Sequence, residues 1–184
     1  MNLRIFAGAA VLALLAAGSA RAAVTVIGDS LAEDCSKAAF EGKADTGSLN
    51  MCTMALQEGL LDRRDQAGTL INRGVIRLRL NDFAGARADF DLAIATAPKL
   101  GEGWVNRGAV NVGEKRYQDG LTDINKGLQL GVEEPAKAYY NRALAYEGMD
   151  DEKSAYLDYQ QALTLKPNWD LPKKELLRFT VIRR

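Results

Sequence analysis

Apolar residues between residues 67 and 169 recur at intervals of three, four and seven, which is the spacing of one face of an α-helix. In the clearest segment these positions are Phe83, Ala86, Phe90 and Ala93. The polar pair Asn81-Asp82 before them is typical of a turn and a helix N-cap, and Asp150-Asp151 stands at the equivalent place later in the chain. Pro98 and Pro167 end the helices that follow these pairs. The pattern predicts antiparallel helical hairpins.

The hairpin pattern is repeated along the chain. Asn72-Arg73-Gly74 recurs as Asn106-Arg107-Gly108, 34 residues later, and as Asn141-Arg142-Ala143 after a further 35. A nearly constant spacing of this size indicates a two-helix repeat. Two such helices touch closely only where both carry small side chains, so we expect Gly74 to face Ala86 and Gly108 to face Gly120.

These copies resemble the tetratricopeptide repeat, whose pattern is W-x2-L-G-x2-Y, then A-x3-F, then a terminal Pro. The matching residues are Trp104, Gly108, Tyr139, Tyr146, Ala86, Phe90, Ala155, Tyr159, Pro98 and Pro167. The copies depart from the pattern at Arg73, Arg107 and Arg142, which replace the usual Leu, and at Ala143, which replaces the usual Gly. The resemblance implies an all-α fold, an α-solenoid of three tetratricopeptide-like hairpins over residues 67–100, 101–135 and 136–169.

Both ends of the repeat region read as caps. Residues 23–66 predict a degenerate N-terminal hairpin, with helices over 32–41 and 48–61 and a turn over 42–47. Residues 170–184 predict a C-terminal capping helix and a basic tail. The apolar residues expected to cover the third hairpin are Leu171, Leu176, Leu177 and Phe179.

The two cysteines, Cys35 and Cys52, fall one on each helix of the degenerate hairpin. An even pair of thiols in an exported protein indicates a disulfide, here closing a loop of about 18 residues and stabilising the fold by roughly 3 kcal/mol. Two buried free thiols, or a redox-active pair, are the alternatives. The spacing is far wider than the C-x-x-C of a typical redox pair.

The first 22 residues have the layout of a secretory signal peptide. Arg4 gives a positive start, an apolar stretch runs from Ile5 to Ala17, and small residues lead to an A-x-A site at Ala20 and Ala22. We therefore expect cleavage after Ala22 and a periplasmic or secreted protein without a membrane span. An uncleaved anchor is the alternative, but the apolar stretch is shorter than the roughly 20 residues of a spanning helix.

The composition of the chain limits which partners, metals and catalytic groups it can be expected to have. Cleavage would remove two arginines and no acid, so 22 basic and 24 acidic side chains would remain, and no nucleic acid is expected as partner. The chain has no histidine, the commonest general base and metal ligand, and two cysteines are too few for a thiolate zinc site. We expect no cofactor, no metal and no catalytic residue.

The candidate binding site is the groove lined by the first helix of each hairpin. There Asn72, Asn106 and Asn141 form a row, and a side-chain amide can pair with both the N–H and the C=O of an extended peptide. The alternative is that these amides bond to neighbouring helices and only hold the repeats together. Beside them the groove residues are Ile71, Val75, Val105, Ala109, Lys137, Tyr140 and Leu144, which would form either inter-repeat core or a stripe for apolar side chains of a partner.

Some tetratricopeptide domains bind the C-terminal carboxylate of a chaperone with paired Lys, Asn and Arg. In this sequence Asn106 and Lys137 match that clamp, whereas Ile71, Val75 and Asn141 occupy its other places. The resemblance therefore does not extend to that clamp.

The sequence favours a non-catalytic scaffold, adaptor or assembly factor of the cell envelope that binds a partner polypeptide. A structural spacer that binds through its convex surface is the alternative. A carboxylate-dependent hydrolytic enzyme is a more distant one, because its candidate acids fall on second helices, where acidic side chains usually face solvent. These acids are Asp89, Asp91, Asp123 and Asp158.

Overall fold

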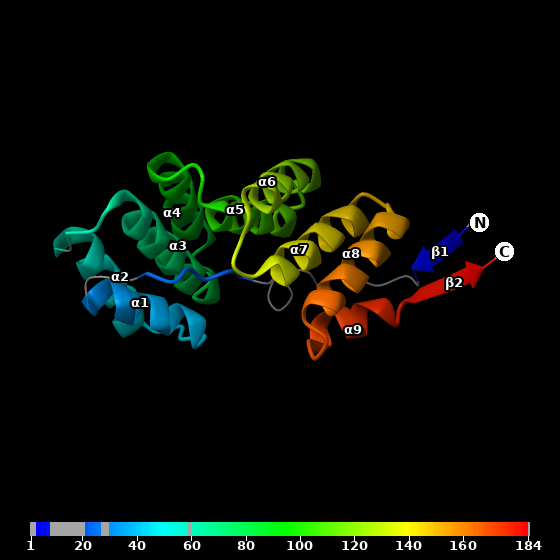
Figure 1. The fold of residues 1–184 in the computed structure, drawn as a ribbon, viewed down its shortest axis with the longest axis horizontal. Coiled ribbons are helices and arrows are strands. Elements are labelled where there is room, and N and C mark those ends of the chain that lie inside the picture. Colours follow the sequence, from blue (N-terminus) through cyan, green and yellow to red (C-terminus); the bar gives the residue numbers. More distant parts are fainter. Residues whose placement is uncertain (1–2, 8–20, 27–29, 59, 184) are drawn as a thin grey trace.

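The computed structural model describes residues 3–7, 21–26, 30–58 and 60–183. Within them, paired antiparallel helices stack side by side into an α-solenoid (Figure 1). The N-terminal pair is α1 (Ser30–Phe40) and α2 (Thr46–Glu58). Three regular hairpins follow: α3 (Arg63–Arg79) with α4 (Phe83–Thr96), α5 (Gly101–Gly113) with α6 (Tyr117–Leu130), and α7 (Pro135–Gly148) with α8 (Glu152–Leu165). The all-α solenoid expected from the repeat is confirmed.

The turn inside each regular hairpin has the same backbone conformation. Its first residue is left-handed in all three copies, with φ of 62° at Asn81, 61° at Lys115 and 59° at Asp150. In the first and third copies the following aspartate caps the second helix: Asp82 accepts a hydrogen bond from the Gly85 amide at 2.9 Å, and Asp151 caps α8 in the same way. The turns and caps predicted from the polar pairs are confirmed.

Close helix contact in the middle hairpin depends on glycine. A Cβ at Gly108 would lie 3.0 Å from the Gly120 carbonyl oxygen, and a Cβ at Gly120 would lie 3.1 Å from the Gly108 carbonyl oxygen, so this expected pair is confirmed. The first hairpin differs, because a Cβ at Gly74 would meet the ring of Phe90 at 2.5 Å. Gly74 therefore makes room for an aromatic ring, and the three atoms nearest to its Cβ position belong to Phe90 rather than to Ala86.

The core consists of two main clusters, one around α3 and α4 and one around α7 and α8. Phe90 and Tyr159 occupy equivalent places on second helices, and both are fully buried. Two apolar residues expected in the core are exposed instead, Phe83 by 38% and Leu177 by 86%. Phe83 is the first residue of α4, directly after the turn. Leu177 lies just beyond the capping helix.

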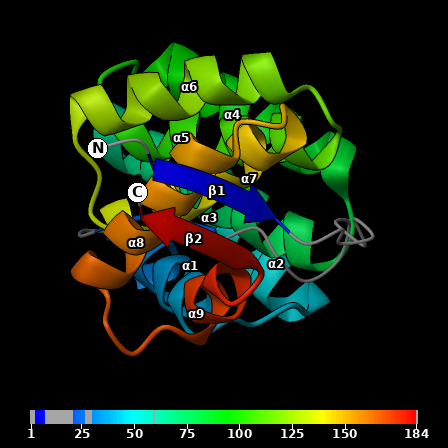
Figure 2. The same ribbon diagram turned by 90° about the vertical axis from the view of Figure 1, so that its right-hand side faces the viewer.

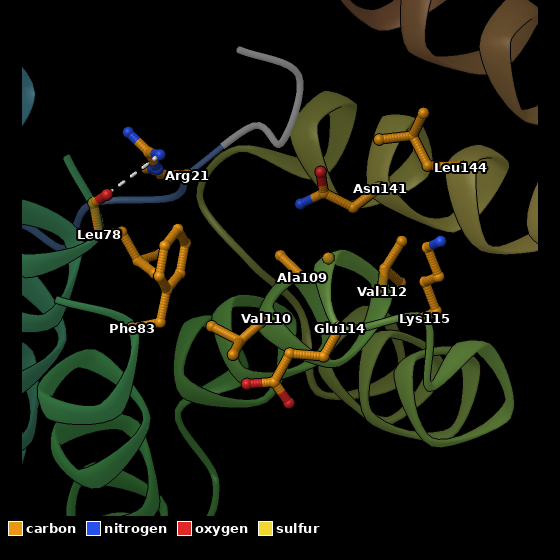
Figure 3. Close-up of a pocket in the computed structure, with 11 residues that line it drawn as sticks. Arg21, Leu78, Phe83, Ala109, Val110, Val112, Glu114, Lys115, Asn141 and Leu144 are labelled. Atoms are coloured by element: carbon orange, nitrogen blue, oxygen red, sulfur yellow. Dashed lines mark hydrogen bonds between the residues drawn. The ribbon is translucent and has the colours of Figure 1, made fainter. Parts of the chain in front are cut away.

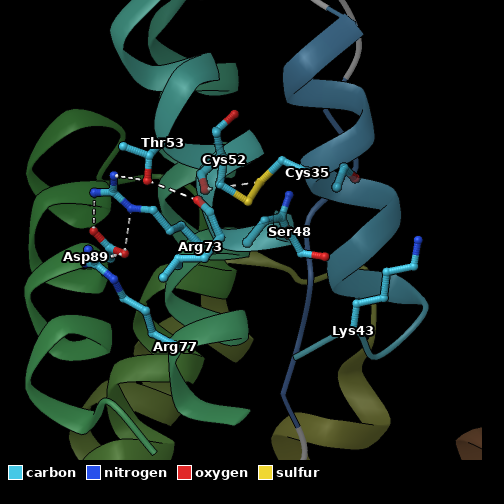
Figure 4. The surroundings of a disulfide bond; sticks show 12 residues. Cys35, Lys43, Ser48, Cys52, Thr53, Arg73, Arg77 and Asp89 are labelled. Atoms are coloured by element: carbon cyan, nitrogen blue, oxygen red, sulfur yellow. Dashed lines mark hydrogen bonds and ion pairs between the residues drawn. A yellow bond between two sulfur atoms is a disulfide. The ribbon is translucent and has the colours of Figure 1, made fainter. Parts of the chain in front are cut away.

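The N-terminal pair is joined by a disulfide between Cys35 on α1 and Cys52 on α2, as expected (Figure 4). Both cysteines are fully buried in the first core cluster. The bridge therefore fixes the short helices α1 and α2 to each other beside α3.

The C-terminal end differs from the predicted helix and tail. Helix α9 (Asp170–Leu176) is short, and β2 (Phe179–Arg183) follows it as a strand, so residues 179–183 are not a tail. Strand β2 pairs antiparallel with β1 (Leu3–Ala7), with Leu3 opposite Arg183 and Ala7 opposite Phe179. Figure 2 shows this two-stranded ladder at the α8 and α9 end of the solenoid. Residues 1–2 and 8–20 of the expected signal peptide lie outside the described residues.

Candidate peptide-binding groove

Residues 21–26 form an extended segment that lies along the first helices of the hairpins (Figure 1). We call this face of α3, α5 and α7 the groove. The segment contacts α7 at Arg21, α5 at Ala22 and α3 at Val24, so it runs in the direction opposite to the order of the hairpins. Ala22, Ala23, Val24 and Val26 are buried. A stretch of the protein's own backbone thus occupies the groove.

Two of the three predicted asparagines hold this segment by its backbone. The Val24 amide donates to Asn72 Oδ1 at 2.8 Å, and Asn72 Nδ2 donates to the Val24 carbonyl at 2.7 Å. Asn106 makes the same pair of bonds with Ala22, at 3.0 and 2.7 Å. Each amide therefore uses its acceptor and its donor on one residue of an extended chain. The alternative in which these two asparagines only join helices is wrong.

Three other side chains hold the segment. Ser36 Oγ of α1 donates to the Val24 carbonyl at 2.8 Å. Thr25 Oγ1 donates to Glu133 Oε2 at 3.2 Å, and Lys137 Nζ donates to the Arg21 carbonyl at 2.8 Å. Lys137 also pairs with Glu134. The predicted groove residue Lys137 thus contacts a backbone carbonyl.

A glycine, Gly68, stands on α3 where Val24 and Val26 of the segment lie against the groove. A Cβ at Gly68 would lie 2.8 Å from Val26 Cγ2 and 3.1 Å from Val24 Cγ1. Either contact is shorter than real Cβ atoms tolerate without a shift of the neighbour. Gly68 therefore permits the close approach of the two valines.

An apolar cavity of about 430 Å³ opens beside the segment, between α5, α7 and the start of α4 (Figure 3). Its lining includes the predicted residues Ala109, Asn141 and Leu144, together with Val112 and the exposed Phe83. Arg21 forms part of the rim, where its Nη2 donates to the Leu78 carbonyl at 3.4 Å. This cavity has room for an apolar side chain.

The other predicted groove residues belong to the core and do not line this cavity. Ile71, Val75, Val105 and Tyr140 are buried to 1% exposure or less. The ring of Tyr140 lies 5.1 Å from that of Trp169, in contact with the chain that leads into α9. The predicted apolar stripe is therefore divided between core and cavity.

Electrostatics around Arg21 disfavour a cation. Burial lowers the pKa of Arg21, and its buried Nε has no hydrogen-bond partner. Burial also lowers the pKa of Arg79, and the nearby charge of Arg21 adds to that effect. The place of the Arg21 side chain would therefore suit a neutral group better.

Sequence reasoning missed an ion pair that recurs inside each hairpin. Arg73 Nη2 lies 2.7 Å from Asp89 Oδ1, Arg107 Nη2 lies 2.7 Å from Asp123 Oδ1, and Arg142 Nε lies 2.6 Å from Asp158 Oδ2. In each copy a second arginine N–H donates to the other carboxylate oxygen, so each pair is bidentate. In the first copy Arg77 also reaches Asp89, at 2.8 Å (Figure 4).

These pairs explain why arginine stands where the repeat pattern has Leu. Asp89, Asp123 and Asp158 are buried, so the expectation that they face solvent is wrong. Asp91 is exposed as expected and accepts a hydrogen bond from Arg107 Nη1 at 2.9 Å. The hydrogen bond to Asp123 is the main cause that raises the pKa of Arg107. All three buried acids are thus paired with arginines of the same hairpin.

Within the described residues, no group of three or more His, Cys, Asp or Glu residues is placed to hold a metal ion. Among the same residues, no helix combines the length and the apolar character needed to cross a bilayer.

Comparison with known proteins shows which sequences the chain is similar to. The family model "Tetratricopeptide repeat" matches residues 136–168. Sperm-associated antigen 1 of Mus musculus is 30% identical over 109 residues, which are 55% of this chain but 12% of that protein. The chain thus spans a small fraction of this relative's length.

Two solved structures are similar in fold. The first TPR of Spaghetti (RPAP3), bound to the HSP90 peptide SRMEEVD, has a TM-score of 0.58 and 22% identity, and the match covers 64% of this chain and 94% of that one. MamA has a TM-score of 0.60 and 18% identity, and the match covers 82% of each chain. These likenesses show that the chain shares their fold.

Proposed function

We propose that this tetratricopeptide-repeat protein is a non-catalytic scaffold, adaptor or assembly factor of the cell envelope that holds an extended segment of a partner polypeptide in its groove. The observation that carries the proposal is the two-point pairing of Asn72 and Asn106 with the backbone of residues 24 and 22. Because those bonds involve only N–H and C=O groups, another extended chain could make them.

Three further observations support the proposal. The cavity at Arg21 offers apolar surface next to the paired backbone. A protein of similar fold binds a short peptide, the HSP90 peptide SRMEEVD. The disulfide and the signal-peptide pattern favour the oxidising environment of the envelope.

Binding through the convex surface is the second candidate, and it also has an observation in its favour. Leu92 on α4 and Leu157 and Leu165 on α8 are large apolar side chains that are 44% to 53% exposed on second helices. Such residues could bind a partner outside the groove.

Site-specific photo-crosslinking in the envelope separates the two candidates. We expect a crosslinker at Val112, in the cavity, to capture a partner, and one at Leu157, on the outer face, to capture none. The Asn106→Ala variant should abolish capture at Val112, whereas Asn168→Ala, which truncates an exposed amide, should not. Capture at Leu157 that does not depend on Asn106 would favour the convex surface instead.

A further inference from the structure

The C-terminal strand β2 is anchored to the last hairpin at its first residue. Phe179 is 9% exposed, and the centre of its ring lies 5.7 Å from that of Tyr156 and 6.1 Å from that of Tyr159, both on α8. Directly before the strand, Arg178 Nη2 lies 2.7 Å from Glu147 Oε1 of α7. These contacts fix the point at which β2 leaves the solenoid, and Figure 1 shows the strand extending beyond α8 and α9.

The partner of β2 is a strand that the mature chain is expected to lose. Residues 179–183 pair with residues 3–7 in one continuous antiparallel register, and this ladder is the only sheet among the described residues. Residues 3–7 belong to the predicted signal peptide, so cleavage after Ala22 removes β1. The mature chain then carries β2 with a row of unpaired N–H and C=O groups, which is a template for the addition of another strand.

The sequences of β1 and β2 follow the same pattern of residue types. Read from the N-terminal end, the first four positions of each strand are apolar, polar, apolar with a branched β-carbon, and apolar or aromatic. These residues are Leu3, Arg4, Ile5 and Phe6 in β1, and Phe179, Thr180, Val181 and Ile182 in β2. A strand with the sequence of β2 therefore offers, at four of five positions, the kind of residue that β1 offers.

Antiparallel pairing of β2 with a second β2 is symmetric about its middle residue. Val181 lies opposite Ile5 in the β1 ladder, so in the same register it lies opposite Val181 of the second copy. Thr180 then lies opposite Ile182, and Phe179 opposite Arg183, each pair occurring twice. The two Arg183 residues stand at opposite ends of the ladder, about 13 Å apart, so like charges do not face each other. Arginine opposite phenylalanine is a favourable pair.

We propose that the mature protein forms a two-fold dimer in which β2 pairs antiparallel with β2 of a second copy, in the place that β1 holds. Because β1 contacts α8, the incoming strand also lies against α8 and covers the last hairpin of its partner. The same surface of both copies is used, as in other two-fold interfaces. The ladder is short, so the dimer is weak and depends on concentration.

The dimer uses a different part of the molecule from the groove. The groove lies on α3, α5 and α7, whereas Figure 2 shows the ladder at the α8 and α9 end of the solenoid. A second copy that approaches this end leaves the groove accessible. Two joined copies then present two grooves, and a partner with two extended segments binds both more tightly than it binds one.

Sedimentation equilibrium of the exported and processed protein tests dimerisation. We expect the weight-average mass to rise with concentration from that of one processed chain toward twice that value. Val181→Pro, which removes a backbone N–H from the ladder, should weaken the dimer by about tenfold or more. Val181→Thr keeps the N–H and a branched β-carbon, so it should dimerise like the wild type. The full chain, made by cell-free translation without membranes so that it keeps β1, should stay monomeric.

Cysteine crosslinking of the processed protein tests the register. Residues opposite each other in an antiparallel ladder have Cα atoms roughly 4.5 to 5.5 Å apart, which a disulfide can bridge. With oxidised glutathione as oxidant, Val181→Cys should form a covalent dimer with itself. Thr180→Cys and Ile182→Cys should crosslink efficiently only when the two variants are mixed. Thr164→Cys, exposed on α8, is the control and should stay monomeric. The two native cysteines are joined to each other, so they do not react.

The outcomes separate this proposal from the proposed function. A single-chain mass at every concentration, a Val181→Pro variant that dimerises like the wild type, or a processed chain that retains residues 3–7 would overturn the dimer. Crosslinking of Thr180→Cys with itself that equals crosslinking in the mixture would overturn the register about Val181. Partner capture at Val112 depends on Asn106 and not on β2, so the proposed function stands or fails on that separate measurement.

Discussion

The bidentate pair between Arg142 and Asp158 should contribute strongly to the stability of the third hairpin. The two N–H donors lie 2.6 and 2.8 Å from the two carboxylate oxygens, and the side chains are only 22% and 9% exposed. Exposed ion pairs contribute about 0 to 1 kcal/mol, whereas breaking a buried pair costs roughly 3 to 5 kcal/mol. This pair is mostly buried, so we expect a cost between these ranges.

A double-mutant cycle measures this coupling. We expect Asp158→Ala to lower the free energy of unfolding by about 1 to 3 kcal/mol, because Arg142 loses both bonds to the carboxylate and keeps its hydrogen bond to Asn125 and its contacts with the rings of Tyr139 and Tyr146. Arg142→Ala should cost a similar amount, since it leaves a buried carboxylate without its partner. The double variant should cost less than the sum of the single variants, with a coupling energy of about 2 kcal/mol.

Urea unfolding followed by circular dichroism gives the four free energies. Asp170 and Lys173 provide the control cycle, because their charged atoms are 3.8 Å apart and the Asp170 side chain is 81% exposed. The control coupling should be indistinguishable from zero. If the coupling of Arg142 and Asp158 is equally small, the geometry shared by the three pairs does not stabilise the hairpins, and our reasoning on them is wrong.

Three further predictions concern packing, burial and the disulfide. Gly108→Ala should destabilise the fold by about 1 to 3 kcal/mol in the same urea assay, because its Cβ would lie 2.7 Å from Ile124 Cγ1. Gly113→Ala should instead stabilise the fold by up to about 1 kcal/mol, because its Cβ would have nothing within 4 Å. Burial raises the pKa of Glu102, so the stability that this side chain contributes is present at acid pH and is lost as pH rises through that pKa. The stability gained by Glu102→Gln should therefore be largest at neutral pH and vanish in acid. Urea unfolding measured across a range of pH will show this dependence. Reduction of the disulfide should cost about 3 kcal/mol in the wild type and nothing in the Cys35→Ala, Cys52→Ala double variant.

The hairpins could be predicted because local signals and packing agree in them. Asn81-Asp82 specifies a left-handed turn residue followed by an N-cap, and the chain adopts both. Gly108 and Gly120 meet as two small residues must when helices approach closely. Each of these signals lies within one hairpin, so the sequence spacing is sufficient to interpret it.

The recurring arginine–aspartate pairs have a signal in the sequence. Asp89, Asp123 and Asp158 recur with the same intervals as the arginines, always 16 residues later. Taken singly, each arginine is a departure from the repeat pattern and each aspartate resembles a charge on the outer face. Judged together, the matched intervals indicate that one charge compensates the other inside every hairpin.

The occupant of the groove could not be predicted in the same way. Residues 21–26 carry no helical period, and they meet Asn106 across 84 positions of the chain. The asparagine row indicated that an extended backbone could bind, but nothing local to Val24 or Ala22 shows which backbone does so. The placement of Phe83 at the cavity depended on the same long-range arrangement.

The way the segment lies in the groove limits how the protein could recognise a partner. Asn72 and Asn106 pair with residues 24 and 22, two positions apart, and two residues of extended chain span about 7 Å. Successive hairpins thus contact alternate residues of one strand, through backbone atoms that every sequence shares. Discrimination between partner sequences has to come from the places where partner side chains contact the groove. These places are the surface at Gly68 and the apolar cavity at Phe83. Since the segment itself fills the first of these places, the cavity is where one partner could be selected over another.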